Sequence, residues 1–234
     1  MKNITDMKVN QIRIFPVDIV PLSMITSKSC AEKVREAFSF GGVEIGPTVD
    51  GRNIIIFIRG EYKRENNVII VSKIEVDTRR IIIEVEGTSK DGNQVYEHFL
   101  STVATLAHID LEDLGKPLLT AETTQCVITL DFNFEQMFNS VFIEFLKNNV
   151  EKEASSVMAK ASVRPIMAAA DINYEIIDGA LKDNKINMNP KQFSIGLRPG
   201  APAKKRKYFV SSPFDSDTHL KLIDELENAI NKAV

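Results

Sequence analysis

The segment from Asn53 to Glu86 constrains the fold more than any other part of the chain. It contains three runs rich in isoleucine and valine, NIIIFIRGEY, VIIVSKIEVD and IIIEVE, separated by the short polar segments KRENN and TRR. β-branched residues favour strands, and short polar segments between such runs favour tight turns. The sequence therefore predicts a meander of three antiparallel strands.

Alternation of side chains across a strand divides each run into two faces. One face is almost purely aliphatic, and we expect it to pack against helices. It consists of Ile54, Ile56, Ile58, Val68, Ile70, Ile74, Val76, Ile81, Ile83 and Val85. The opposite face combines charged residues with an apolar band that consists of Ile55, Phe57, Ile69, Val71 and Ile82. Two explanations of this band stay open: another part of the chain covers it, or a partner binds there.

The composition is that of a globular protein and argues against several other classes. The chain has 234 residues, of which 44% are hydrophobic and 26% charged, enough for one large domain or two small ones. The net charge of −3 provides no positive field that would attract nucleic acid or a membrane surface. No apolar run approaches the roughly 18 residues of a membrane helix, and the N-terminus lacks a signal-peptide core. Cys30 and Cys126 are far apart, which favours reduced thiols and a cytoplasmic location.

The first half of the chain contains strands and helices in a definite order. We expect residues 1–10 to be a flexible arm, and residues 11–20 to be a strand that Pro16 places at an edge or a bulge. The capping-box pattern from Ser29 to Glu32 predicts a short helix. After the meander and a turn, residues 96–107 carry apolar side chains at helical spacing. Residues 11–108 thus form a first α+β half, followed by a junction at 109–124.

The second half, residues 125–234, begins with the predicted strand QCVITLDF. The next helix carries an apolar and aromatic stripe, which we expect to be core; the alternative is a helix that packs on a partner. The stripe consists of Phe134, Met137, Phe138, Val141, Phe142, Phe145 and Leu146. A hairpin over 192–212 and a final helix complete this half.

The two halves share one order of elements: strand, helix, several antiparallel strands, helix. This order predicts a duplicated β-α-β(3–4)-α unit, in which each curved antiparallel sheet has its helices on one face. It resembles the lobes of the TATA-binding-protein fold. The resemblance concerns the order of elements, and fold does not determine function, so no functional residue follows from it.

The sequence contains no recognisable catalytic or metal-binding motif. A phosphate-binding glycine loop, a nucleophile elbow and a zinc-binding helix motif are all missing. His98, His108 and His219 are irregularly spaced, and the acidic segment after His108 is interpreted as a solvated helix end. We therefore expect no catalytic residue, no metal site and no cofactor.

The sharpest local charge feature is a basic loop that consists of Lys204, Lys205, Arg206 and Lys207. Four cations between two strands could contact phosphates, or they could form a solvated hairpin tip that discourages aggregation. Two hypotheses follow. The first is a non-enzymatic intracellular interaction module that associates through a sheet face with itself, as a homodimer, or with a protein partner. The second is a nucleic-acid-binding protein that uses the basic loop; a membrane partner is not expected.

Overall fold

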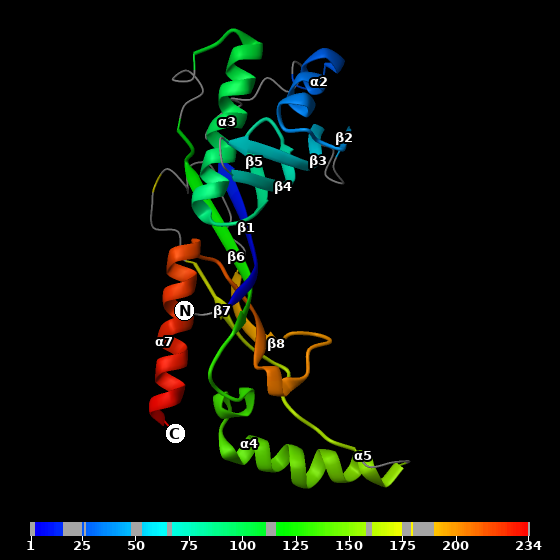
Figure 1. Ribbon diagram of the computed structural model, residues 1–234, viewed down its shortest axis with the longest axis vertical. Helices are drawn as coiled ribbons and strands as arrows, with labels where there is room; N and C mark the ends of the chain where they lie inside the picture. Colours follow the sequence, from blue (N-terminus) through cyan, green and yellow to red (C-terminus); the bar gives the residue numbers. More distant parts are fainter. Residues whose placement is uncertain are drawn as a thin grey trace.

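A computed structural model describes residues 3–15, 25, 27–47, 53–64, 67–110, 116–157, 161–174, 179 and 190–233. Within these residues nine antiparallel strands form one sheet, in the order β2-β3-β4-β5-β1-β6-β9-β8-β7 (Figure 1). The strands are β1 Ile4–Ile14, β2 Gly42–Pro47, β3 Asn53–Arg64, β4 Asn67–Val76, β5 Arg80–Glu86, β6 Leu119–Thr129, β7 Met167–Ile172, β8 Lys191–Leu197 and β9 Lys207–Ser212. The longest helices are α2 Lys28–Ala37, α3 Ser89–Ala107 and α7 Ser216–Ala233. The fold is thus mixed helix and strand, as the sequence predicts.

Strand β1 lies in the middle of the sheet, between β5 and β6. This corrects two predictions, because residues 4–10 belong to β1 rather than to a flexible arm, and β1 is not at an edge. The strand was misjudged because Gln11 and Arg13 point into the protein and are buried, which hides the apolar alternation of a central strand. Pro16, on which the edge prediction rested, lies outside the described residues. Likewise, β6 begins at Leu119, inside the predicted junction.

The predicted meander is confirmed as strands β3, β4 and β5, but its faces are partly exchanged. Ile55 and Phe57 are fully buried and belong to the core that α2 and α3 cover. The other set in β3, Ile54, Ile56 and Ile58, was expected to pack against the helices. These residues alternate with Ile55 and Phe57 along the strand and therefore point to the opposite face. The buried residues of this first core in the sheet are Val9, Ile55, Phe57, Ile69, Val71, Ile74, Val76, Ile81, Ile83 and Val85.

A bulge explains the exchange within β4. Strand β4 pairs Val71 with Val85 of β5 and then Lys73 with Glu84, so Ser72 is an extra residue. Buried positions in β4 therefore change from odd numbers to even ones after Ser72. The neighbouring strand β3 changes at the same level, at Arg59, whose φ of 57° is left-handed.

A second core lies beneath α7 on the same face of the sheet. Its fully buried members include Ile128, Tyr208 and Val210 from the strands and Ile223 from the helix. Helices α2, α3 and α7 therefore cover one face, which we call the inner face. No helix among the described residues packs on the opposite, outer face.

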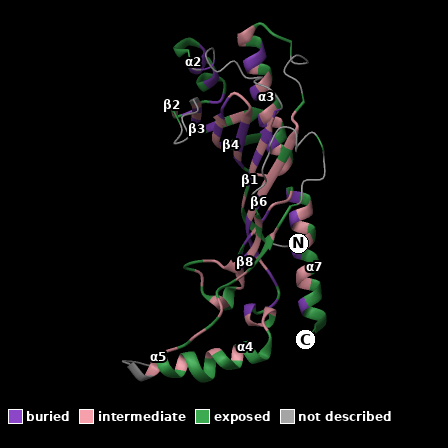
Figure 2. Cartoon of the chain, turned by 180° about the vertical axis from the view of Figure 1, so that it is seen from behind, coloured by how far each residue is buried: buried purple, intermediate pink, exposed green. Residues whose placement is uncertain are grey.

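One helical segment leaves the body of the protein (Figures 1 and 2). A 3₁₀ turn, η2 (Phe134–Met137), leads into α4 (Ser140–Phe145), a π-helical turn η3 (Leu146–Val150) and α5 (Glu151–Val157). We call residues 140–157 the arm. The expectation that its aromatic stripe is core is wrong beyond Phe138, since Phe142 is 44% exposed and Phe145 52% exposed. Periodicity identifies an apolar stripe but does not show what covers it.

Of the helices that the structure describes, none is long and apolar enough to cross a membrane.

Candidate functional site

The structure brings a serine, a histidine and a cysteine together beneath α7. Ser212 Oγ lies 2.6 Å from His219 Nδ1, and His219 Nε2 lies 3.3 Å from Cys126 Sγ. The three side chains are at most 1% exposed. A nucleophile needs access to its substrate and an ionised or activated form. Burial removes both, so this group is a hydrogen-bonded part of the core.

The pKa values of this buried group agree with a structural role. Burial raises the pKa of the Cys126 thiol to about 12, which keeps the weakly nucleophilic thiol form at neutral pH. Burial also lowers the pKa of His219 to about 4, because the charged imidazolium would lose its hydration there. The sequence did not reveal this contact across 93 positions. The sequence did contain one indication of burial. His219 lies four residues before Ile223, so both residues lie on the same side of α7, and that side is buried.

The other predicted site segments do not converge. The ring of His98 stacks on Tyr62 with centroids 4.7 Å apart and meets Phe38 edge-on, as part of an aromatic cluster. His108 ends α3 in a left-handed conformation, while residues 111–113 of the acidic segment lie outside the described residues. Among the residues that the structure describes, no three histidine, cysteine or acidic side chains are placed to hold a metal ion.

The basic loop is not a cluster of free cations. Arg206 forms an ion pair with the Asp131 carboxylate, and Lys207 is the first residue of β9. Lys204 and Lys205 lie in the short η4 turn (Ala203–Lys205) and are exposed. Arg206 is thus paired within the chain, Lys207 is half-buried, and Lys204 and Lys205 are the exposed cations of the four that were predicted to act together.

The predicted partner-binding band is buried in the protein itself. Ile55, Phe57 and Val71 are 0% exposed, and the other two members, Ile69 and Ile82, are at most 8% exposed. Of the two explanations left open, cover by the chain itself is therefore the observed arrangement, and these side chains do not form a surface. Four members of the band lie on the inner face, whereas Ile82 lies on the outer face by alternation and is 8% exposed.

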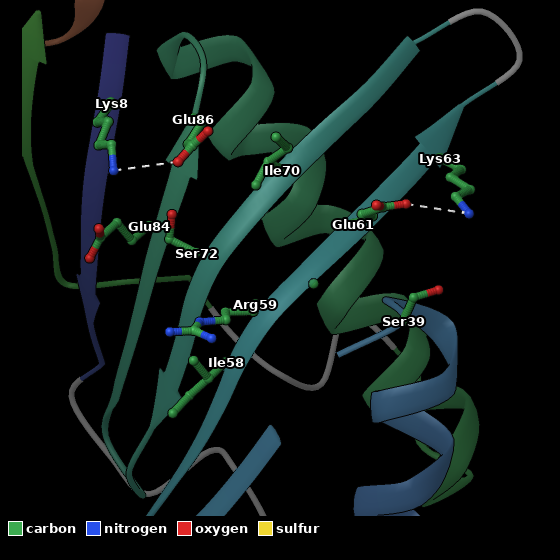
Figure 3. Close-up of a pocket in the computed structure, with 11 residues that line it drawn as sticks. Lys8, Ser39, Ile58, Arg59, Glu61, Lys63, Ile70, Ser72, Glu84 and Glu86 are labelled. Atoms are coloured by element: carbon green, nitrogen blue, oxygen red, sulfur yellow. Dashed lines mark ion pairs between the residues drawn. The ribbon is translucent and has the colours of Figure 1, made fainter. Parts of the chain in front are cut away.

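A hollow of about 730 Å³ lies on the outer face of the sheet at the bulge (Figure 3). Four neighbouring strands contribute to it: Lys8 from β1, Glu84 and Glu86 from β5, Ile70 and Ser72 from β4, and Ile58, Arg59, Glu61 and Lys63 from β3. Figure 3 shows these side chains on the near side of the sheet, with helices behind it. The hollow is thus an open surface feature and not a closed active-site pocket.

The turn after α2 holds the bulge in place. Gly41 N–H approaches the carbonyls of Ile58 and Arg59 at 3.1 and 3.0 Å, and Glu61 N–H donates to Phe38 O at 2.6 Å. Gly60 makes this contact close, because a Cβ there would lie 2.5 Å from the Phe40 ring. The tight packing explains the left-handed backbone of Arg59, which is uncommon for a residue with a side chain. The hollow is therefore built into the fold.

The charges around the hollow are mixed. Lys8 pairs with Glu86 at 3.4 Å, and Lys63 pairs with Glu61 at 3.3 Å. In the described part of the chain Arg59 and Glu84 form no ion pair. This surface carries charges of both signs together with half-exposed isoleucines. Such a surface is more complementary to a protein partner than to the phosphate backbone of a nucleic acid. None of these charged residues was predicted as a site, although an isolated glycine in a strand, Gly60, is a recognised sign of a bulge.

Comparison with known proteins adds no family. No protein-family model matches the chain, and a search of curated proteins finds no related sequence. Arguments about function therefore rest on the chain's own geometry.

Proposed function

We propose that the protein is a non-enzymatic interaction module that binds a protein partner, or another copy of itself, through the outer face of its sheet. The observation that carries this proposal is the hollow at the bulge, on a sheet face without helical cover in the described structure. Enzymatic function has less support, because the described nucleophile and base candidates, Cys126 and His219, are buried.

The chemistry of the outer face favours a partner with mixed charges and an apolar patch. Arg59 is exposed and Glu84 lies across the hollow from it, so each is available for an opposite charge on a partner. Ile70, which lines the same hollow, is 46% exposed and supplies apolar area. Apolar anchors surrounded by a polar rim are the usual composition of protein–protein contacts.

We also propose that the fold is the duplicated unit expected from the sequence, arranged as in the TATA-binding-protein fold. The order of the sheet supports it, since β5, β4 and β3 follow β1 on one side as β9, β8 and β7 follow β6 on the other. Each half ends in a helix on the inner face, α3 or α7.

Local contacts at the starts of these two helices support the same duplication. Thr88 and Asp91 cap α3 reciprocally, and Asp215 accepts hydrogen bonds from Thr218 at the start of α7. One turn later each helix packs closely on the central strand of its half. His219 contacts Cys126 of β6, while a Cβ at Gly92 would lie 2.8 Å from the Gln11 amide of β1.

The test of function compares an outer-face variant with a helix-side control. Ile70→Glu changes an exposed side chain in the hollow, while Lys221→Glu changes an exposed side chain on α7 that is 75% exposed. We expect affinity capture from the native cell to yield a protein, or untagged copies of this chain, that Ile70→Glu loses at least about tenfold. Lys221→Glu should retain it.

Two results would contradict the proposal. One is capture that is equal for the wild type and the Ile70→Glu variant. The other is nucleic-acid binding that weakens steeply with salt and disappears on changing Lys204 and Lys205 to alanine, which is the signature of phosphate contacts. The second result would favour the nucleic-acid hypothesis.

A further inference from the structure

We propose that the arm exchanges between two copies of this chain, so that the arm of each copy covers the inner face of β7, and the partly buried Phe193 and Leu197 of β8 beside it, in the other. This inference goes beyond the proposed function because it concerns the inner, helix-bearing face and names its occupant. Exchange of an identical element between protomers is a common route to homodimers.

The surface that the arm would cover is the open end of the inner face. Ala168 packs at the margin of the second core, which identifies the inner side of β7. Ile166 and Ala170 share that side by alternation, and Ile166 is 67% exposed. In β3, which has the corresponding place in the first half, the inner residues Ile55 and Phe57 are 0% exposed.

The first half shows what kind of element belongs on this surface. Helix α2 follows the central strand β1 in the chain and packs on the inner face, with Val34 fully buried in the core. The arm follows the other central strand, β6, in the same way, but its apolar side chains face solvent. Among the described residues, an exposed strand surface and a helix with an exposed apolar stripe therefore occur in this half, where the first half has α2 packed on its sheet.

The arm is built to present one apolar stripe. In a regular α-helix Val150 would lie about 140° around the axis from Phe145. The π-helical turn from Leu146 to Val150 is wider, which reduces this angle and brings Val150 towards the side of Phe142 and Phe145. Val141, Phe142, Phe145 and Val150 are between 39% and 70% exposed. Such a stripe normally faces a protein surface.

Contacts at the base of the arm hold it away from its own body, which favours a second copy over closure within one chain. The rings of Phe134, Phe138 and Phe142 follow one another at 5.4 and 5.8 Å, and Phe134 is anchored in the second core. Lys147 pairs with Glu135 of the preceding turn at 3.5 Å. Folding the arm back onto its own sheet would break these contacts.

The contact area is sufficient for a dimer. A helix of 18 residues is about 27 Å long and about 10 Å across, so it shields about 270 Å² on each of the two surfaces that it joins. Two such contacts in a symmetric dimer remove about 1,100 Å² from water, which reaches the usual lower limit of specific interfaces.

Light scattering after size exclusion, combined with a mixing experiment, tests the exchange. We expect the wild type to have twice the 26.2 kDa mass of one chain. Phe145→Glu/Val150→Glu damages the stripe of the arm, and Ile166→Glu damages the surface it covers; each should weaken the homodimer at least about tenfold. All three side chains are exposed, so both variants should fold. Lys152→Ala, an exposed arm residue outside the stripe, is the control and should leave the dimer unchanged.

Mixing a tagged arm variant with an untagged Ile166→Glu variant should restore association, because one intact arm then meets one intact surface. The inference is overturned by a monomeric wild type, by an Ile166→Glu variant that dimerises normally, or by a mixture that associates no better than its components. A dimer lost in Ile70→Glu but retained in the arm variant would also overturn it, while supporting the proposed outer-face function. Conversely, arm exchange with no partner at the outer face would leave this inference intact and refute that function.

Discussion

Ser89 and Ser216 hydrogen-bond to each other reciprocally. Ser216 N–H donates to Ser89 Oγ at 2.7 Å, and Ser89 N–H donates to Ser216 Oγ at 3.1 Å. Each serine is the first residue of its helix, α3 or α7, so each contact satisfies a backbone N–H that has no partner within its own helix. The two helices that cover the two halves of the sheet are thus joined at their N-termini.

Removing one hydroxyl of this pair should destabilise the protein. We expect Ser216→Ala to lower the free energy of unfolding by about 1–2 kcal/mol, because it leaves the partly buried Ser89 N–H without this acceptor. Urea denaturation measures the change, and Ser101→Ala, at an exposed position of α3, should be neutral. In the double mutant Ser89→Ala/Ser216→Ala, the loss of unfolding free energy should differ from the sum of the two single losses. A loss equal to that sum would mean that the two contacts act separately.

Acid should destabilise the protein through His219. Its folded pKa of about 4 lies below the ordinary 6.5, so the unfolded chain binds this proton first as the pH falls. The neutral histidine contributes stability that is complete above pH 6.5 and decreases towards pH 4, by about 3 kcal/mol in total. Urea midpoints across this range should therefore fall more in the wild type than in His219→Gln. Equal slopes for the two proteins would show that His219 is not the titrating group.

Gly60 should not tolerate a methyl group. Its Cβ would lie 2.5 Å from the Phe40 ring and 2.7 Å from Phe38 O, so we expect Gly60→Ala to cost about 1–3 kcal/mol of stability. Gly46 in β2 is the matched control, since no atom lies within 4 Å of its Cβ position. Thermal denaturation of both variants makes the comparison. A Gly60→Ala protein as stable as Gly46→Ala would show that the bulge is not held by close packing.

Two phenylalanines from the sequence analysis should behave oppositely. Phe57→Ala should cost about 3–5 kcal/mol, because the side chain is fully buried in the first core. Phe142→Ala should cost far less at protein concentrations too low for association, because the ring is 44% exposed in a single chain. Chemical denaturation at low concentration distinguishes them. A large loss in Phe142→Ala there would indicate an arm that packs on its own body.

The parts of the fold that depend on neighbouring residues could be read from the sequence. The meander was predicted correctly because β-branched runs and short polar turns act locally. Its faces were not. In β4 strict alternation fails at an inserted residue, Ser72, and in β3 both alternating sets of residues 54–58 are apolar, so the pattern does not identify the inner one. Gly60 interrupts a strand rich in isoleucine and so indicates where the strand pairing is irregular. The outer-face hollow could have been located from it, although its partners on β1 and β5 could not.

Features that depend on distant residues were beyond the sequence. Arg13 is buried in the middle of the molecule, with Nη2 2.6 Å from Asn93 Oδ1 and its guanidinium 3.7 Å from the Tyr96 ring centre. An arginine in a short strand ordinarily indicates a solvent-facing position, and the partners that make its burial acceptable lie some 80 positions away. Whether the aromatic stripe is buried or exposed could not be determined from the sequence either, since periodicity does not identify the surface that covers a stripe.

The central pairing of β1 with β6 has a consequence for synthesis on the ribosome. Ile14 pairs with Leu119 and Ile4 with Ile128, so one edge of β1 stays unpaired until more than a hundred further residues have been made. Contacts so distant in sequence slow folding, and a bare strand edge invites pairing with other nascent chains. Strand β1 carries polar and charged side chains on both faces, Gln11 and Arg13 on one and Lys8 and Asn10 on the other. These side chains make the unpaired strand a poor template for aggregation.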